Sequence, residues 1–129
     1  MLCNMMSAAE AKTIFLVDDD DFVRESLSAL LEAYDFKVEA FASGKDFLAG
    51  RDRRPDGCLL LDIHMPGLSG IDVLKKLRTQ QDATPVILIT GRRDRTIEVQ
   101  AKALGVVALL DKPIPHAALF AALRQALPA

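Results

Sequence analysis

Several features that would direct a chain to a membrane, a nucleic acid or the cell exterior are absent from this sequence. No apolar run reaches the roughly eighteen residues that a membrane span needs. The segment from Met1 to Met6 is short and lacks the charged start of a signal peptide. The net charge is −2, from 16 basic and 18 acidic residues, whereas nucleic-acid-binding domains normally carry a strongly basic face. We therefore expect a soluble cytoplasmic domain that does not bind nucleic acid directly.

Cysteine is scarce, and internal repeats and low-complexity stretches are absent. The two cysteines, Cys3 and Cys58, show no metal-ligand spacing. Cys58 lies in an apolar run, which indicates a buried free thiol in a reducing compartment. The length of 129 residues, 50% of them hydrophobic, fits one globular domain with a real core. We expect residues 1–11 to form a flexible N-terminal tail and residues 12–129 to form the domain.

Five short apolar runs alternate with segments of helical spacing. The runs cover residues 13–17, 36–40, 58–61, 85–89 and 106–110. Ser43, Ser69 and Asp94 precede three of the helical segments as capping residues, and Pro115 marks the start of the last one. Such alternation is typical of an α/β fold. We therefore predict a single doubly wound (βα)5 domain of flavodoxin-like type, with a five-stranded parallel sheet and helices on both faces. The second run is weaker and alternates, which favours an exposed or edge strand.

Four consecutive aspartates, Asp18 to Asp21, follow the first apolar run. The carboxyl end of a buried parallel strand lies at the sheet edge where α/β folds bind ligands. Carboxylates packed this closely repel each other unless a cation lies among them. Carboxylate oxygens suit a hard divalent metal, usually Mg²⁺ when a phosphoryl group is also bound. We therefore predict Asp18 and Asp19 as metal ligands, and Asp20 and Asp21 as helix-capping or solvated charges.

Three more polar side chains stand at or just after predicted strand ends. Asp62 follows the third run, Thr90 follows the fourth, and Lys112 lies two residues after the fifth. Together with the aspartate pair, they would place three carboxylates, a hydroxyl and an ammonium at one edge. This set suits phosphoryl transfer to a carboxylate, because an aspartate can accept the group covalently. The cationic and hydroxyl groups would stabilise the phosphoryl oxygens.

These residues resemble the receiver domains of two-component response regulators. The motifs are Val-Asp-Asp at 17–19, Leu-Asp-Ile-His-Met-Pro-Gly at 61–67, Ile-Thr-Gly at 89–91 and Asp-Lys-Pro at 111–113. The resemblance covers residues 13–127 and is strongest to receivers that precede helix-turn-helix output domains. No output domain lies within these residues. The sequence leaves open whether the chain is a stand-alone receiver or the first part of a longer regulator.

The resemblance implies a phosphoacceptor and a metal site. Asp62 would take a phosphoryl group from a phosphohistidine on a cognate sensor histidine kinase. Mg²⁺ would bind Asp19, Asp62 and the backbone carbonyl of His64, with Asp18 acting through ordered water. Such a domain is not an enzyme in the ordinary sense, because it directs phosphotransfer and autodephosphorylation at itself.

The resemblance also implies a switch. Lys112 would pair with the phosphoryl oxygens, and its bond to Pro113 would be cis. Thr90 would move to hydrogen-bond the phosphoryl group, and this would rearrange the surface formed by the fourth strand, fourth helix, fifth strand and fifth helix. That surface would bind an output domain or a second copy in a homodimer. The family usually has Tyr or Phe three residues before the lysine, where this chain has Leu109.

Several nearby residues have no fixed role in the resemblance. His64 and Arg92 lie two residues after Asp62 and Thr90, so both would flank the phosphoryl site and could tune its hydrolysis by water. We expect Arg93, within the basic group after Thr90, to be a solvated loop residue. His116, at the start of the last helix, is also expected to be solvated.

Three alternative functions fit the sequence less well. A phosphatase of the haloacid dehalogenase type would carry its nucleophile on the first strand and a second aspartate where His64 stands. A flavodoxin-like nucleotide binder would need a glycine-rich loop after the first strand, and here that loop is acidic. A phosphorylation-independent, receiver-like interaction module would not need the complete acceptor set that the sequence contains.

Overall fold

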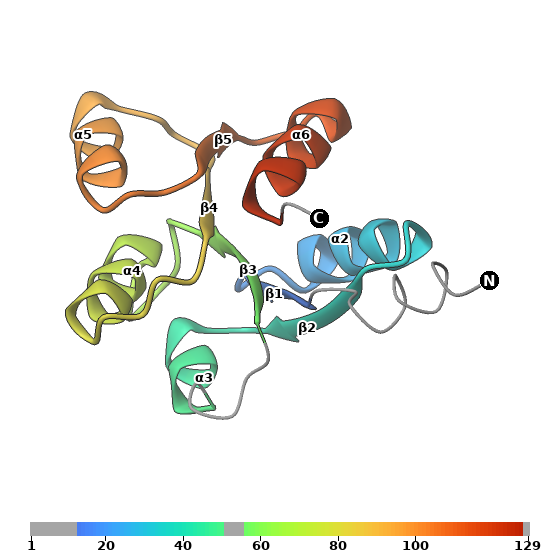
Figure 1. Cartoon of the computed structure of the whole chain (residues 1–129), viewed down its shortest axis with the longest axis horizontal. Helices are drawn as coiled ribbons and strands as arrows, with labels where there is room; N and C mark the ends of the chain where they lie inside the picture. Colours follow the sequence, from blue (N-terminus) through green and yellow to red (C-terminus); the bar gives the residue numbers. More distant parts are fainter. Residues whose placement is uncertain (1–12, 51–55, 128–129) are drawn as a thin grey trace.

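The structure is a computed structural model that describes residues 13–50 and 56–127. It contains one sheet of five parallel strands with the order β2-β1-β3-β4-β5, shown in Figure 1. The strands are β1 (Thr13–Val17), β2 (Lys37–Phe41), β3 (Gly57–Asp62), β4 (Val86–Thr90) and β5 (Ala108–Asp111). The helices are α2 (Asp21–Ala33), α3 (Gly44–Ala49), α4 (Gly70–Thr79), α5 (Arg95–Ala103) and α6 (His116–Ala126). The predicted doubly wound fold is confirmed, and β2 lies at an edge as its alternating sequence indicated.

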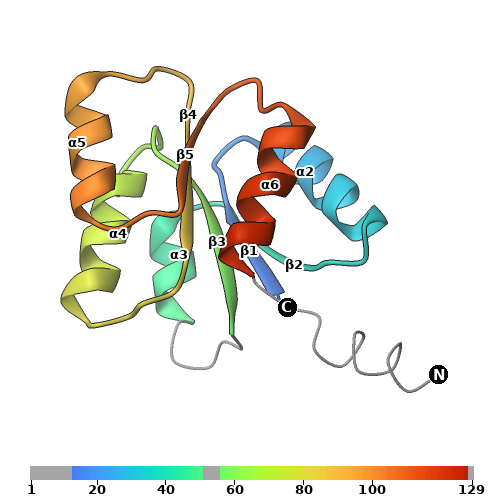
Figure 2. The same ribbon diagram turned by 45° about the horizontal axis from the view of Figure 1, so that its top comes forward.

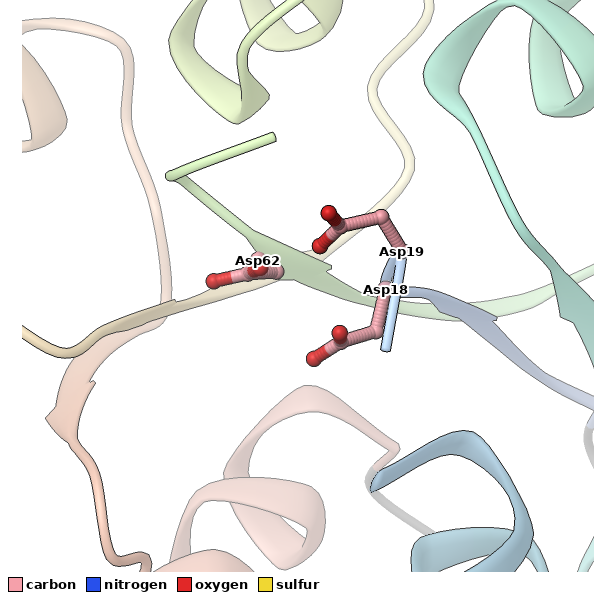
Figure 3. A group of neighbouring side chains, drawn as sticks. All are labelled: Asp18, Asp19 and Asp62. Atoms are coloured by element: carbon pink, nitrogen blue, oxygen red, sulfur yellow. The ribbon is translucent and has the colours of Figure 1, made fainter. Parts of the chain in front are cut away.

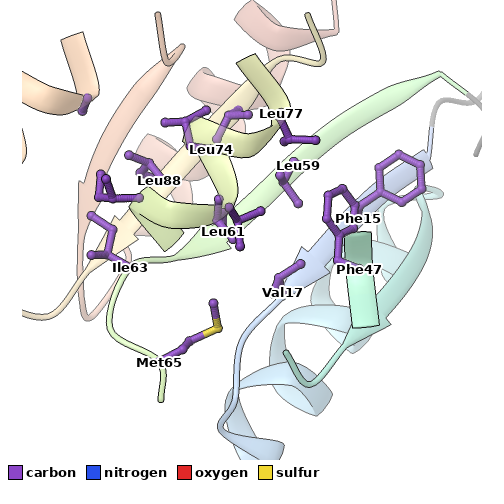
Figure 4. Close-up of a cluster of buried hydrophobic side chains, with 14 of the residues drawn as sticks. Phe15, Val17, Phe47, Leu59, Leu61, Ile63, Met65, Leu74, Leu77 and Leu88 are labelled. Carbon is purple, nitrogen blue, oxygen red and sulfur yellow. The ribbon is translucent and has the colours of Figure 1, made fainter. Parts of the chain in front are cut away.

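The helices cover both faces of the sheet. Figure 2 shows α3, α4 and α5 on one side and α2 and α6 on the other. The three central strands are apolar on both faces, as expected for a parallel sheet covered on both sides. Within β1, Phe15 packs toward α3 and α4, whereas Ile14 and Leu16 pack toward α2 and α6. This alternation divides the core into two layers. Figure 4 shows the layer that contains Phe15 and packs against α3 and α4.

The helix-start residues act as the sequence indicated. Asp20 accepts a hydrogen bond from the N–H of Val23 and so caps α2. Ser69 and Asp72 form a reciprocal capping box at the start of α4. Each cap satisfies N–H groups that the first helical turn leaves without a partner. Because α2 and α4 both begin at the carboxyl edge of the sheet, their caps also fix the loops that carry the polar strand-end residues.

Three further expectations concern Cys58, the N-terminal tail and possible membrane spans. Cys58 is fully buried with a free thiol, and burial raises its pKa to about 12. That state fits the predicted structural role. The predicted tail, residues 1–11, lies outside the described residues. Within 13–50 and 56–127, no helix is long and apolar enough to cross a membrane.

Candidate functional site

Three carboxylates meet at the carboxyl edge of the sheet. Parallel pairing aligns Val17 of β1 with Leu61 of β3, so Asp18 and Asp62 follow at neighbouring positions. Asp18 and Asp62 are buried, whereas Asp19 is exposed. One carboxylate oxygen from each of the three lies within 4.8 Å of the others. Figure 3 shows the three side chains gathered together. The structure therefore brings together the three aspartates that the sequence placed in this site.

The backbone around Asp18 fixes the direction of its side chain. The N–H of Asp18 donates to the carbonyl of Phe41, extending the pairing of β1 with β2. The N–H of Asp20 donates to Asp18 Oδ1 at 2.9 Å, and Arg24 Nη1 donates to the Asp18 carbonyl at 2.6 Å. These bonds leave Asp18 Oδ2 directed at Lys112. The acidic loop is thus held by α2 and by the edge strand together.

Lys112 supplies the positive charge of the site. Its Nζ lies 3.4 Å from Asp18 Oδ2 and 3.3 Å from Asp62 Oδ1. Its backbone N–H donates to the Thr90 carbonyl at 2.9 Å, and the Lys112–Pro113 peptide bond is cis as expected. Burial alone would lower the pKa of Lys112, but the carboxylates of Asp62 and Asp18 outweigh this effect and raise it. The lysine is therefore an ammonium shared by two aspartates.

Asp62 remains incompletely satisfied despite this lysine. Its Oδ1 is buried and, within the described part of the chain, has no hydrogen-bond partner, because the 3.3 Å contact with Lys112 lacks hydrogen-bond orientation. Burial, followed by the charge of Asp18, raises the pKa of Asp62 against the opposing effects of Lys112 and the His64 N–H. A buried carboxylate oxygen without a donor is costly. It is also free to bind a cation or to attack an electrophile.

The donor set fits the divalent cation that the sequence predicted. Three carboxylates offer the hard oxygen ligands that Mg²⁺ binds, and one ammonium cannot neutralise all three. The unpartnered Asp62 oxygen is an available ligand position. The other predicted ligand, the backbone carbonyl of His64, lies two residues after Asp62. The intervening residue, Ile63, is held against β4, because its N–H donates to the carbonyl of Ile89.

Thr90 is fully buried at the end of β4, and its hydroxyl contacts both site-flanking residues that the sequence identified. Thr90 Oγ1 accepts from the backbone N–H of Arg92 at 3.0 Å. His64 Nε2 lies 3.0 Å from the same oxygen. The side chain of Arg92 itself is exposed, so its contribution to this arrangement comes from the backbone.

Glycine is required where α4 approaches the end of β3. A Cβ atom on Gly70 would lie 2.4 Å from the carbonyl oxygen of Asp62 and 2.8 Å from Cα of Ile63. Both are backbone atoms, which cannot rotate away. The Gly70 N–H also donates to the Ile63 carbonyl at 2.9 Å. Gly70 thus lets the capped start of α4 pack directly against the backbone of the candidate acceptor.

Arg93 is an exposed loop residue, as predicted, but it also makes contacts that the sequence did not predict. Its guanidinium donates to Asp111 Oδ1 at 3.0 Å, to the Leu109 carbonyl at 2.6 Å and to Glu98 Oε2 at 3.3 Å. These bonds join the loop after β4 to β5 and α5. Leu109 itself is half-buried and packs its side chain on the α3–α4–α5 side of the core. Nothing in the local sequence signals the contacts of Arg93, because they depend on how α5 and β5 pack.

Comparison with known proteins identifies the family. Residues 14–124 match the family model of the response regulator receiver domain. This chain belongs to that family. As a receiver domain of two-component signalling, it is a signalling module rather than a conventional enzyme, and receiver domains generally bind Mg²⁺ through acidic residues.

Relatives of this receiver domain include transcriptional regulators. It is 39% identical over 120 residues to the transcriptional regulatory protein FixJ of Bradyrhizobium diazoefficiens, covering 90% of this chain and 58% of FixJ. It is 38% identical over 117 residues to the response regulator protein TodT of Pseudomonas putida, covering 91% of this chain and 52% of TodT. The chain therefore spans between about half and three-fifths of these relatives.

Solved receiver structures share the fold closely. The response regulator StyR superposes with a TM-score of 0.85 at 40% identity, over 91% of this chain and 59% of StyR. The structure titled FixJ-N gives a TM-score of 0.83 at 33% identity, over 89% of this chain and 92% of that one. The Vibrio cholerae chemotaxis protein CheY4 gives 0.81 at 28% identity, over 90% and 98%.

Proposed function

We propose that Asp62 is the phosphoacceptor of this receiver and takes its phosphoryl group from a phosphohistidine on a sensor histidine kinase. The observation that carries this proposal is the buried Asp62 Oδ1, which lacks a hydrogen-bond partner among the described residues and lies 3.3 Å from Lys112 Nζ. An attacking oxygen needs a free lone pair, and the phosphoryl oxygens need a nearby cation. Asp62 and Lys112 provide these two conditions together.

Phosphoryl transfer to Asp62 would be a displacement at phosphorus. An Asp62 oxygen forms a bond to phosphorus while the phosphorus–nitrogen bond of the phosphohistidine breaks, and the departing imidazole takes up a proton. The product is an acyl phosphate on Asp62. Hydrolysis by water would later return the carboxylate and release inorganic phosphate, which is the autodephosphorylation expected of such a domain.

The other site residues have supporting roles in this proposal. Lys112 would pair with the phosphoryl oxygens, and the Thr90 hydroxyl would donate a hydrogen bond to one of them. Asp18, Asp19, Asp62 and the backbone carbonyl of His64 would hold Mg²⁺, with Asp18 acting through water. When bound, the ion supplies positive charge that offsets the negative charge on the phosphoryl oxygens.

Phosphorylation of Asp62 would rearrange the surface formed by β4, α5, β5 and α6. Thr90 ends β4, and Lys112 follows β5, so both switch residues border this surface. We infer that it binds an output domain or a second copy of the chain. A transcriptional output is suggested by the relative FixJ, a transcriptional regulatory protein that this chain matches over 58% of its length.

The test is the intact mass of the chain after incubation with acetyl phosphate, with and without Mg²⁺. The expected result is a Mg²⁺-dependent gain of one phosphoryl group that is labile at alkaline pH. Asp62→Asn should abolish the gain, and Asp35→Asn, a change at an exposed turn aspartate, should not affect it. An unmodified wild-type chain under every condition would contradict the proposal and favour the phosphorylation-independent interaction module.

A further inference from the structure

The hydroxyl of Thr90 is already engaged in the structure without a phosphoryl group. Within the described residues, Thr90 Oγ1 has two polar contacts, the N–H of Arg92 and Nε2 of His64, each at 3.0 Å. The side chain of Thr90 is completely buried, so water does not replace either contact. The first contact has a fixed direction, because a backbone N–H can only donate.

The proton of the hydroxyl decides the direction of the second contact. A threonine hydroxyl carries one donor and two acceptor lone pairs. If His64 Nε2 also donated, Thr90 Oγ1 would accept twice, and its own buried proton would have no acceptor among the described contacts. An unsatisfied buried donor is strongly disfavoured. The arrangement that satisfies every group has the His64 proton on Nδ1 and the Thr90 proton donated to Nε2. This tautomer is inferred from the contacts.

We propose that His64 is a positioning residue that holds the Thr90 proton in the resting state and opposes its transfer to the phosphoryl group. The inference rests on the proposed function, in which Thr90 donates to a phosphoryl oxygen. Phosphoryl oxygens accept hydrogen bonds and do not donate them. His64 Nε2 and the phosphoryl group therefore compete for the one proton of the Thr90 hydroxyl. The hydrogen bond to His64 must break before Thr90 can donate to the phosphoryl group.

The position of His64 in the chain makes this competition part of the site. The residue lies two positions after Asp62, in the loop that leaves β3, whereas Thr90 ends the neighbouring strand β4. The His64–Thr90 contact therefore ties the acceptor loop to the switch residue directly. Replacing the imidazole leaves the backbone carbonyl of His64 in place, so the side-chain contact can be tested separately from the predicted metal ligand.

The experiment measures binding of beryllofluoride, an acceptor-only mimic of the phosphoryl group, in the presence of Mg²⁺ and at one fixed pH for all variants. His64→Ala removes the competing acceptor and should bind beryllofluoride about three- to tenfold more tightly, the effect of one ordinary hydrogen bond. His64→Gln can return a side-chain acceptor to a similar position and should restore an affinity near that of the wild type. His116→Ala, which removes the other histidine, should leave the affinity unchanged.

A second measurement examines the resting chain without any ligand. The ¹⁵N shifts of the His64 ring should show the proton on Nδ1, and the Thr90 γ-methyl resonance should shift in His64→Ala but not in His116→Ala. Unchanged beryllofluoride affinity in His64→Ala, or a proton on Nε2, would overturn the proposal. If the wild type binds no beryllofluoride and gains no phosphoryl group, the proposed function fails. A perturbed Thr90 resonance would then show a structural contact only, which also overturns the positioning role.

Discussion

Replacing Asp62 by asparagine should stabilise the chain when divalent cations are absent. Oxygens of Asp18, Asp19 and Asp62 lie at most 4.8 Å apart. At an effective dielectric constant of about 20, each such pair repels by at least about 3.5 kcal/mol. Lys112 attracts Asp62 at 3.3 Å by about 5 kcal/mol. Burial of the Asp62 carboxylate and repulsion by the buried Asp18 together outweigh this attraction, since the pKa of Asp62 is raised, whereas solvent screens the repulsion by Asp19. Allowing for screening at the exposed Asp19, we expect Asp62→Asn to raise the free energy of unfolding by about 1–3 kcal/mol.

The pH dependence has a definite sign. The folded state raises the pKa of Asp62 above its ordinary value of 3.8, chiefly through burial. Folding therefore favours the protonated carboxyl, so the cost is absent below the unfolded-state pKa. The cost grows as the pH rises from about 3.8 through the raised pKa and is complete above it. The gain from Asp62→Asn should accordingly be full above the raised pKa and vanish in acid.

The assay is urea unfolding followed by circular dichroism, in EDTA, at pH values on either side of this window. Asp35→Asn is the control, because it removes the same charge at an exposed turn residue whose φ of 69° also suits asparagine. Adding Mg²⁺ should reduce the advantage of Asp62→Asn, because the ion stabilises only the wild-type carboxylate cluster fully. A destabilised Asp62→Asn in EDTA at neutral pH, or an equal gain in acid, would refute the electrostatic reasoning.

Three further substitutions test how the site is held. Gly70→Ala should lower the free energy of unfolding by about 2 kcal/mol or more, because the added Cβ would clash with the Asp62 backbone. The measurement is urea unfolding, with Gly91→Ala as the control. Gly91→Ala should cause a much smaller change, because no atom lies within 4 Å of its added Cβ. Ser69→Ala should cost about 1 kcal/mol in the same assay through the lost capping box, and an unchanged midpoint would contradict that role. Arg93→Ala should cost about 1 kcal/mol or less, with the difference from wild type shrinking in high salt; a salt-independent loss would point to packing instead.

The sequence predicted the sheet and its functional edge because both depend on patterns within short segments. Each apolar run overlaps a strand, and the polar residues that follow four of the five runs reached the predicted edge. The boundaries shifted where tertiary pairing decided them. Within the run at 106–110 the strand β5 begins only at Ala108. The N–H of Val106 returns to the Ala101 carbonyl after α5, whereas the N–H of Val107 already donates to the Val86 carbonyl of β4. Residues 1–11 lie outside the described part of the chain, so their predicted flexibility stays a prediction.

The contacts that the sequence did not predict join segments far apart in the chain. The His64–Thr90 contact links residues 26 positions apart, and Arg93 bonds to Asp111 across 18 positions. Neither contact follows from residue type or spacing, since each depends on side-chain rotamers and on the packing of neighbouring strands. Likewise, Gly70 is distinguished from other glycines only by the approach of α4 to β3. Local patterns predict the proposed acceptor, whereas the contacts that restrain it require the three-dimensional structure.

Leu109 shows why these restraining contacts matter for signalling. The family usually couples the switch threonine to its output surface through an aromatic ring at this position, and leucine is smaller and makes no polar side-chain contact. In this chain, backbone and arginine hydrogen bonds already connect the same two strands. The Lys112 N–H donates to the Thr90 carbonyl, and Arg93, three residues after Thr90, donates to the Leu109 carbonyl and to Asp111. In the proposed switch, a displacement of the Thr90 backbone would stretch these bonds or move β5 with it, so the movement would reach the proposed output surface without rotation of an aromatic side chain.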